Sequence, residues 1–189
     1  IVVDIFSGTG AVADTFKDKM LITNDLLFSN YISNVAFFAP MEYSEVKVVE
    51  YIYKFNMIQT KESNYVRENF ADTFFSADDC SKIGYVRERI ETEYKNGKIN
   101  FKEYAILITS LLYGMDRIAN TVGHYDAYRK NAGFDKELTF PVLLPERNLN
   151  ENNRCYNKDA NELISDLECD LLYLDPPYNS RQYCDAYHL

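Results

Sequence analysis

Two short runs of β-branched and other apolar residues lie near the start of the chain and predict β-strands. The first run, residues 1–6, reads Ile-Val-Val-Asp-Ile-Phe, and the second, residues 21–25, reads Leu-Ile-Thr-Asn-Asp. A glycine turn and an apolar segment at 11–17, which predicts a helix, separate them. Strand, glycine turn, helix and strand in this order are typical of the first unit of a doubly wound α/β fold.

A further apolar run near the end, Leu-Leu-Tyr-Leu at residues 171–174, shows no alternation of polar and apolar positions. This pattern is typical of a parallel strand that is buried on both faces. Asp175-Pro176-Pro177-Tyr178 follows at once. Two prolines can neither donate ladder hydrogen bonds nor continue into a helix interior. The motif therefore predicts a stiff strand exit, which is either a plain turn or part of the sheet edge where open α/β sheets bind ligands.

Between these strands, apolar residues recur at helical spacing. Residues 42–55 predict one helix, with an apolar stripe that would contain Val46, Val49, Ile52 and Tyr53. Such stripes favour packing against a core over formation of a binding groove.

Two capping signals mark the starts of two further helices. Ser76-x-x-Asp79 precedes the first, and Asn100-x-x-Glu103 precedes the second. The second helix has a long apolar face, formed by Tyr104, Leu107, Ile108, Leu111, Met115 and Ile118. We therefore expect these helices to pack together as a lobe.

A strand-like segment at 154–157 and a predicted helix at 161–167 return the chain to the sheet. The expected fold class is α/β, with a partial parallel sheet and a helical insertion between its second and third strands. Residues 1–40 would form the first part of the core, 41–149 the insertion, and 150–189 the second part of the core.

The net charge of −9 argues against a nucleic-acid partner, because phosphate affinity comes largely from lysine and arginine. The distribution of charge weakens this objection. Residues 41–130 contain 13 basic side chains against 14 acidic ones, whereas residues 161–189 contain 1 against 6. Local basic patches are therefore compatible with the middle of the chain.

The four cysteines show no close pairing and the chain has two histidines, which predicts neither a zinc site nor a disulfide framework. Reduced cysteines and the absence of an apolar run of ~20 residues favour a cytoplasmic protein outside the membrane. The first residue is Ile1, already within a predicted strand, so we interpret the chain as a fragment.

The glycine turn after the first strand is a candidate ligand loop. Gly8 and Gly10 allow a sharp turn and a close approach of the backbone to a ligand. With Ala13 they match a loose dinucleotide fingerprint, and Asp25 follows 17 residues after Gly8. The Asp25 carboxylate could accept both hydroxyls of a ribose or cap the next helix, and a nicotinamide-dependent oxidoreductase is one interpretation.

Two other polar positions are candidates for binding. Asp159 follows the predicted third strand, where it would face the ligand crevice or act as the N-cap of the next helix. Residues 123–130 mix aromatic side chains with Arg129 and Lys130. This segment could stack on bases and bind phosphates, or could be a solvated helix end.

The order of these motifs along the chain resembles that of a known enzyme family. Residues 4–10, Asp-Ile-Phe-Ser-Gly-Thr-Gly, and the motif at 175–178 resemble the S-adenosylmethionine loop and the catalytic motif of Dam-like adenine-specific (N6) DNA methyltransferases. Residues 175–187 and 120–125 are similar to members found in restriction-modification systems. The resemblance implies a Rossmann-like methyltransferase core with a target-recognition insertion. Ile5 replaces a frequent proline, and an upstream cofactor motif and the later strands are missing, so the fragment is not expected to methylate alone.

The resemblance also implies roles for individual residues. The methionine part of the cofactor would be held by Asp4, Phe6, Ser7, Gly8 and Gly10, with Asp175 beside it. Asp25 would bind the ribose hydroxyls and Asp159 the exocyclic amine of the cofactor's adenine. The catalytic motif comprises Asp175, Pro176, Pro177 and Tyr178, and the substrate contacts comprise Tyr178, Asn179, Arg129 and Lys130. No metal is implied.

The implied chemistry requires these residue types. The amine of adenine is a poor nucleophile because its lone pair is delocalised into the ring. The Asp175 carboxylate and the Pro176 carbonyl could accept its two N–H bonds while the nitrogen attacks the methyl group in line. Tyr178 would stack on the flipped base, which is typically worth ~1–3 kcal/mol. An aspartate here, rather than the serine of many cytosine-N4 enzymes, favours adenine.

The expected partners are double-stranded DNA and, in a restriction-modification system, a cognate endonuclease. RNA or a protein side-chain amide would also present a planar amine to the motif. The nicotinamide-dependent oxidoreductase leaves Asp-Pro-Pro-Tyr unexplained, and a truncated non-catalytic DNA-binding module is the remaining interpretation.

Overall fold

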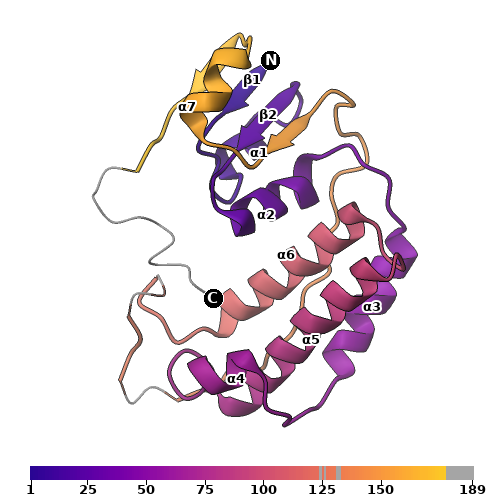
Figure 1. The fold of residues 1–189 in the computed structure, drawn as a ribbon, viewed down its shortest axis with the longest axis vertical. Helices are drawn as coiled ribbons and strands as arrows, with labels where there is room; N and C mark the ends of the chain where they lie inside the picture. The colour runs from indigo at the N-terminus through magenta and orange to yellow at the C-terminus, as the bar shows by residue number, and fades with distance from the viewer. Residues whose placement is uncertain (124, 126, 131–132, 178–189) are drawn as a thin grey trace.

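The computed structural model describes residues 1–123, 125, 127–130 and 133–177. Within them, four parallel strands form one sheet, and Figure 1 shows it at one end of the molecule with a group of helices at the other. The predicted α/β class is therefore confirmed. None of the helices in these residues is both long and apolar enough to cross a membrane.

The sheet consists of β1 (Val2–Asp4), β2 (Leu21–Asn24), β3 (Arg154–Tyr156) and β4 (Leu171–Tyr173) in the order β3-β2-β1-β4. The chain builds outward from β1 to β2 and β3, and then returns to place β4 on the other side of β1. The two directions meet between β1 and β4, and open α/β sheets bind ligands at such a switch point, at the carboxyl ends of the strands.

Burial differs sharply across the sheet. Every residue of β1 and β2 is buried, as expected of inner parallel strands. In β4, however, Leu171 is 44% exposed and Tyr173 is 37% exposed. The predicted burial of this strand on both faces is therefore wrong. In the described part of the chain β4 pairs only with β1 and ends the strand order, so its outer edge lacks a neighbour there.

Two helices follow the first two strands. α1 (Ala11–Thr15) is shorter than predicted, and α2 (Phe28–Phe38) connects the sheet to the helical lobe. Ile32, Val35 and Ala36 of α2 belong to the same apolar core as the lobe. After β3, α7 (Ala160–Leu163) and a 3₁₀ turn, η1 (Ile164–Asp166), precede β4.

The helical lobe lies between β2 and β3 in the sequence. It contains α3 (Glu45–Met57), α4 (Tyr65–Phe70), α5 (Ala77–Lys95) and α6 (Phe101–Ile118). Figure 1 shows α6 between α2 and α5. The short α4 is the helix that the sequence patterns did not indicate, because it spans less than two turns.

Polar side chains start these helices as the sequence predicts. Ser76 accepts the backbone N–H of Asp79, and Asn100 and Glu103 form a complete reciprocal capping box. The predicted apolar face of α6 is buried along its whole length. These starts and this face are confirmed.

The predicted stripe of α3 is correct only at Ile52, which is buried, and is wrong at Val46, Val49 and Tyr53. Val46 and Tyr53 are 69% and 67% exposed, whereas Val48, Ile52 and Phe55 are buried. Both sets have helical spacing, so periodicity alone does not identify the face that packs against α6.

A buried lysine joins the lobe to α2. The side chain of Lys102, at the start of α6, is fully buried and donates to the carbonyls of Val35 and Ala39 at 2.8 and 2.7 Å. These carbonyls lie at the carboxyl end of α2, where a cation is favoured. Burial lowers the pKa of Lys102 to about 8.

Candidate functional site

Three predicted acidic residues meet at the carboxyl edge of the sheet. Asp4 is the last residue of β1, Asp25 directly follows β2, and Asp175 lies two residues beyond β4. In the register of the sheet, Asp4 pairs with Tyr173, which places the end of β1 beside the Asp175 turn. The negative charges of Asp25 and Asp175 both act on Asp4. The two ends of the chain therefore contribute to one site.

Asp4 is a buried carboxylate whose pKa is raised. Its side chain is 2% exposed, and neither carboxylate oxygen has a hydrogen-bond partner of good geometry in the described residues. Burial raises the pKa of Asp4 to about 6, the nearby Phe6 N–H offsets part of the rise, and the two acidic neighbours add to it. A cationic group of a ligand would reduce the free-energy cost of this buried carboxylate, which lacks a hydrogen-bond partner of good geometry.

The glycine loop is held against β2. The backbone N–H of Ser7 and its hydroxyl both donate to the Asn24 carbonyl, at 2.9 and 3.0 Å. Gly8 and Gly10 have φ values of 52° and 86°, which L side chains rarely adopt. A Cβ on Gly10 would lie 2.6 Å from the Phe38 ring, so a glycine is needed there for close packing as well.

Asp25 supports this loop directly. One carboxylate oxygen accepts the Gly8 N–H at 2.8 Å, and the other accepts the Leu27 N–H at 2.8 Å. Leu27, not Asp25, occupies the N-cap position of α2, so the predicted capping role is wrong. The Asp25 side chain instead closes a turn by accepting the N–H of the residue two positions later. Each oxygen has a second lone pair, and the proposed ribose contact stays a prediction.

Asp159 begins α7. Its carboxylate accepts the Asn161 N–H at 2.8 Å, which confirms the N-cap interpretation. It also lines a cavity of about 100 Å³ together with Phe6, Leu26 and Ala160. The cavity lies between the loops that follow β1, β2 and β3, so the predicted contact with adenine is compatible with this position but stays a prediction.

Asn24 is a residue of this site that the sequence reasoning missed. Its amide donates to the carbonyls of Ile5 and Lys158, and its oxygen accepts the Lys158 N–H. It therefore ties the ends of three strands together. A buried asparagine at the end of an apolar strand is the signal that would have identified it.

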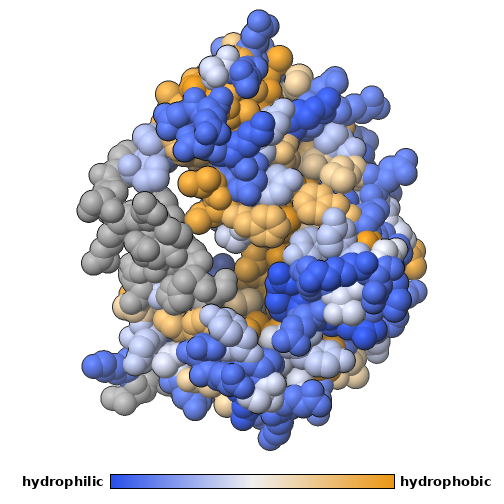
Figure 2. Space-filling model, in the orientation of Figure 1, coloured by the Kyte–Doolittle hydropathy of each residue, from blue (hydrophilic) through white to orange (hydrophobic). Residues whose placement is uncertain are grey.

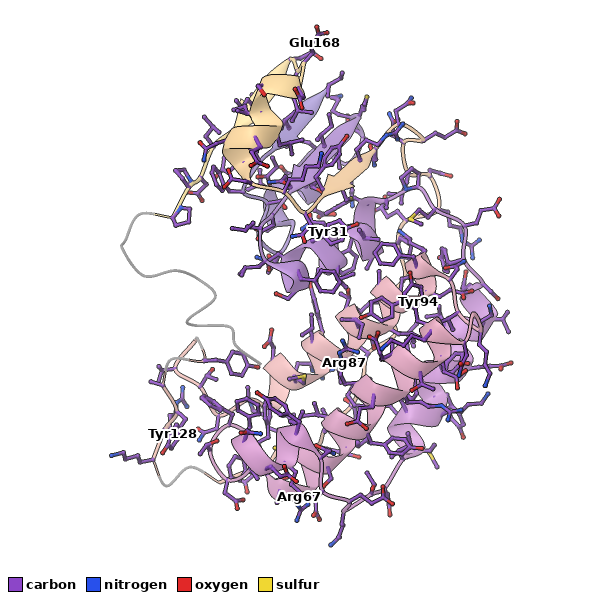
Figure 3. All side chains as sticks on the ribbon, in the orientation of Figure 1. Tyr31, Arg67, Arg87, Tyr94, Tyr128 and Glu168 are labelled. Atoms are coloured by element: carbon purple, nitrogen blue, oxygen red, sulfur yellow. The ribbon has the colours of Figure 1, made fainter. Side chains whose placement is uncertain are left out.

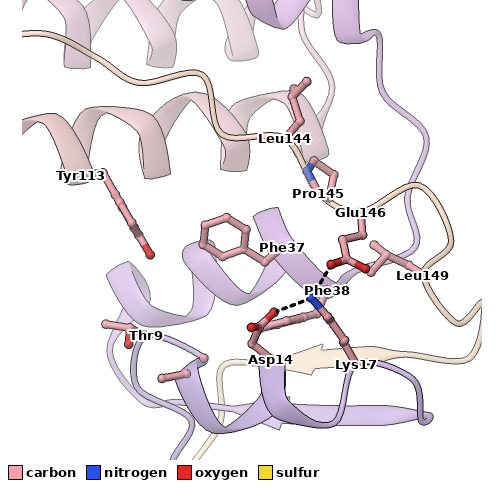
Figure 4. Close-up of a pocket in the computed structure, with 12 residues that line it drawn as sticks. Thr9, Asp14, Lys17, Phe37, Phe38, Tyr113, Leu144, Pro145, Glu146 and Leu149 are labelled. Carbon is pink, nitrogen blue, oxygen red and sulfur yellow. Dashed lines mark hydrogen bonds and ion pairs between the residues drawn. The ribbon is translucent and has the colours of Figure 1, made fainter.

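A larger cavity of about 390 Å³ lies between α1, the end of α2 and the segment at 144–149. Figure 4 shows Lys17 in contact with Asp14 and Glu146 at its edge. Of the predicted site residues it contains only Gly10, and none of the clustered carboxylates lines it. The clustered carboxylates therefore lie outside this cavity, although it borders the glycine loop.

The predicted DNA-contact segment is anchored on the lobe. Asn120 donates to the carbonyls of Thr73 and Arg129, and Thr121 pairs with Tyr128 across an antiparallel bridge. The side chains of Arg129 and Lys130 are exposed, and Figure 3 shows Tyr128 at the outer edge of the lobe. The solvated-helix alternative is wrong, because these residues lie in a bridged loop.

Of the catalytic motif, Asp175, Pro176 and Pro177 are exposed at the end of the described residues, and Tyr178 and Asn179 lie outside them. Ile164, Leu171 and Leu174, in the last part of the described chain, are also exposed. Figure 2 shows hydrophobic residues at the surface of the end of the molecule that contains the sheet.

Comparison with known proteins gives consistent matches over the whole chain. The family model of the D12 class N6 adenine-specific DNA methyltransferases matches residues 1–189. The type II methyltransferase M.NlaIII of Neisseria lactamica is 35% identical over 98% of this chain and 58% of its own length. For M.FokI of Planomicrobium okeanokoites the identity is 31%, over 100% of this chain and 32% of that protein.

The modification methylase StsI of Streptococcus sanguinis is 30% identical over 100% of this chain and 31% of its own length. The chain thus spans between about a third and somewhat over half of these three relatives. No solved structure shows significant similarity to it.

Proposed function

Because the chain belongs to the D12 class N6 adenine-specific DNA methyltransferase family, we propose that the protein transfers a methyl group from S-adenosylmethionine to the N6 amine of adenine in double-stranded DNA. The observation that carries the proposal is the meeting of Asp4, Asp25 and Asp175 at the switch point of the sheet. The match to the family does not favour the nicotinamide-dependent alternative.

The residues at the sheet edge suit this cofactor. Asp4 is a buried carboxylate without a hydrogen-bond partner of good geometry in the described residues, and the ammonium of the methionine part would neutralise it. The backbone of the loop from Phe6 to Gly10 would lie along the same part. Asp25 would accept the ribose hydroxyls, and Asp159, beside the smaller cavity, would accept the adenine amine.

S-adenosylmethionine supplies an electrophilic methyl group when it is bound. The protein's own task is to orient the adenine amine. The Asp175 carboxylate and the Pro176 carbonyl would accept its two N–H bonds, which favours a pyramidal nitrogen with an available lone pair. The two prolines restrict the backbone here, so the two acceptors keep a fixed spacing.

Contacts with DNA would come from both parts of the protein. Tyr178 and Asn179 would contact the flipped base, and Arg129 and Lys130 would bind phosphates from the lobe. The names of the relatives lead us to propose that the protein acts beside a cognate restriction endonuclease, whose site it would protect.

A methyl-transfer assay on the complete protein tests the proposal. Asp175→Ala should abolish transfer to DNA and leave the calorimetric affinity for S-adenosylmethionine largely intact, because the side chain is exposed and its proposed main partner is the acceptor amine. RNA and an amide-containing peptide, offered as competing substrates, identify the acceptor. Unchanged transfer by Asp175→Ala would refute the assignment, and binding of DNA without transfer by the wild type would favour a non-catalytic module.

A further inference from the structure

Asn34 of α2 makes an unusual contact with the glycine loop. Its side chain is 1% exposed, and its amide nitrogen donates to the Gly8 carbonyl at 2.9 Å and to the Asn30 carbonyl at 2.8 Å. Because two carbonyls face this end of the amide, the nitrogen and not the oxygen must occupy it. The contact reaches from a helix of the lobe's core to the proposed cofactor loop.

Gly8 is thereby held on both sides. Its N–H donates to Asp25 and its carbonyl accepts from Asn34, while its φ of 52° lies in the left-handed region. A loop of this kind has many alternative conformations when it is not restrained, and each restraint removes some of them before any ligand arrives.

The contact also orients the next peptide group. In a trans peptide the carbonyl and the following N–H point in opposite directions. Since the Gly8 carbonyl turns toward α2, the Thr9 N–H turns away from it, and this N–H has no acceptor within the described residues. Asn34 therefore keeps one backbone donor of the loop directed away from the helix.

The arrangement has a cost that packing does not explain. The side-chain oxygen of Asn34 is buried and has no hydrogen-bond partner among the described residues. It lies 3.0 Å from the position that a Cβ on Gly10 would take, so it also restricts that glycine. A residue chosen for stability alone would avoid an unpaired buried acceptor.

We propose that Asn34 is a positioning residue that pre-forms the glycine loop for the amino-acid end of S-adenosylmethionine. The inference rests on the proposed function and adds a residue outside the loop and outside the strand ends. Asn34 does not touch the reacting atoms, so its effect falls on cofactor affinity and not on the methyl-transfer step.

Asn34→Ser in the complete protein is the decisive variant. A serine hydroxyl can return to the Asn30 carbonyl, as the Ser33 hydroxyl does to Ser29 at 3.0 Å, but is too short to reach Gly8. Ser33→Ala is the matched control, because it removes a bond within the same helix without touching the loop. Asn34→Ala removes both bonds and serves as the second variant.

The probes are S-adenosylhomocysteine, which has the amino-acid end, and 5′-methylthioadenosine, which lacks it. For Asn34→Ser and Asn34→Ala we expect the calorimetric Kd for the first to rise at least tenfold, with the Kd for the second within about threefold of wild type. The kcat at saturating S-adenosylmethionine should also stay within about threefold. Ser33→Ala should change neither Kd.

An equal weakening for both probes would indicate general damage to the fold and would overturn the proposal. So would a Kd for S-adenosylhomocysteine within twofold of wild type in Asn34→Ser. If the wild type binds neither probe and transfers no methyl group, the proposed function itself fails, which is a different outcome from either of these.

Discussion

Because the carboxylate of Asp4 is buried, we expect the ligand-free protein to be less stable at neutral pH than a variant with a neutral residue at this position. The folded pKa of Asp4 is about 6, raised chiefly by burial from an ordinary value of 3.8. Between these two pH values the folded chain holds more protons than the unfolded chain. The contribution of Asp4 to stability is therefore full below about pH 4 and is lost as the pH rises through 6.

The structure gives a size for this loss. Each pH unit between the folded and unfolded pKa of Asp4 corresponds to about 1.4 kcal/mol, and a discount for partial screening by water leaves about 2 kcal/mol between pH 4 and pH 7. Asp4→Asn keeps the shape of the side chain and removes the titration. The free energy of unfolding of the wild type, minus that of the variant, should therefore fall by about 2 kcal/mol over this range.

Urea unfolding followed by circular dichroism measures both proteins at each pH, and the contributions of carboxylates remote from Asp4 cancel in the difference. A difference that stays flat from pH 4 to pH 7 would refute the reasoning about Asp4. Calorimetry with S-adenosylmethionine supplies the second half of the prediction. The more stable Asp4→Asn should bind it more weakly, because the proposed partner of the ammonium is gone.

Three further predictions concern other parts of the protein. Gly8→Ala should cost about 1 kcal/mol of unfolding free energy from its left-handed backbone alone, whereas Gly10→Ala adds a clash with an aromatic ring and should cost about 3 kcal/mol or more in urea titrations. Because the folded pKa of Lys102 is about 8, below the ordinary lysine value of 10.5, the unfolded chain holds more protons between these values. From pH 7.5 to pH 9.5 the free energy of unfolding of the wild type, minus that of Lys102→Met, should thus rise by roughly 2 kcal/mol. A difference that stays constant over this range would contradict a lowered pKa for Lys102. Replacing Arg129 and Lys130 together with alanine should reduce the slope of log Kd for DNA against log salt by about 2, and an unchanged slope would exclude phosphate contacts from both.

The sequence was sufficient for features that depend on local pattern. The capping box at Asn100 and Glu103 and the apolar face of α6 follow from residue spacing, and both are present. The strand ends were also recognisable, because Asp4 and Asp175 each follow an apolar run. Parallel strands then bring such residues to one edge of the sheet.

Features that depend on tertiary contacts could not be predicted from the sequence. The periodicity of α3 allows two faces that share Ile52, and only packing against α6 selects the one with Val48 and Phe55. Tyr173 is exposed and lies on a strand that ends the strand order within the described residues, and a four-residue apolar run does not reveal that place. Asn34 contacts a loop 26 residues away, and nothing in its local pattern indicates that partner.

The double attachment of α2 bears on attempts to exchange the helical lobe between relatives. Lys102 fastens the end of this helix to α6, and its apolar residues belong to the core of the lobe, while Asn34 reaches the glycine loop. A chimaera that grafted only the segment after α2 would set a foreign α6 against the native α2, so the carbonyls of Val35 and Ala39 would lose the Lys102 that packs with them here. Recombination junctions placed ahead of Phe28 would transfer α2 together with the lobe and preserve the contacts between α2 and α6.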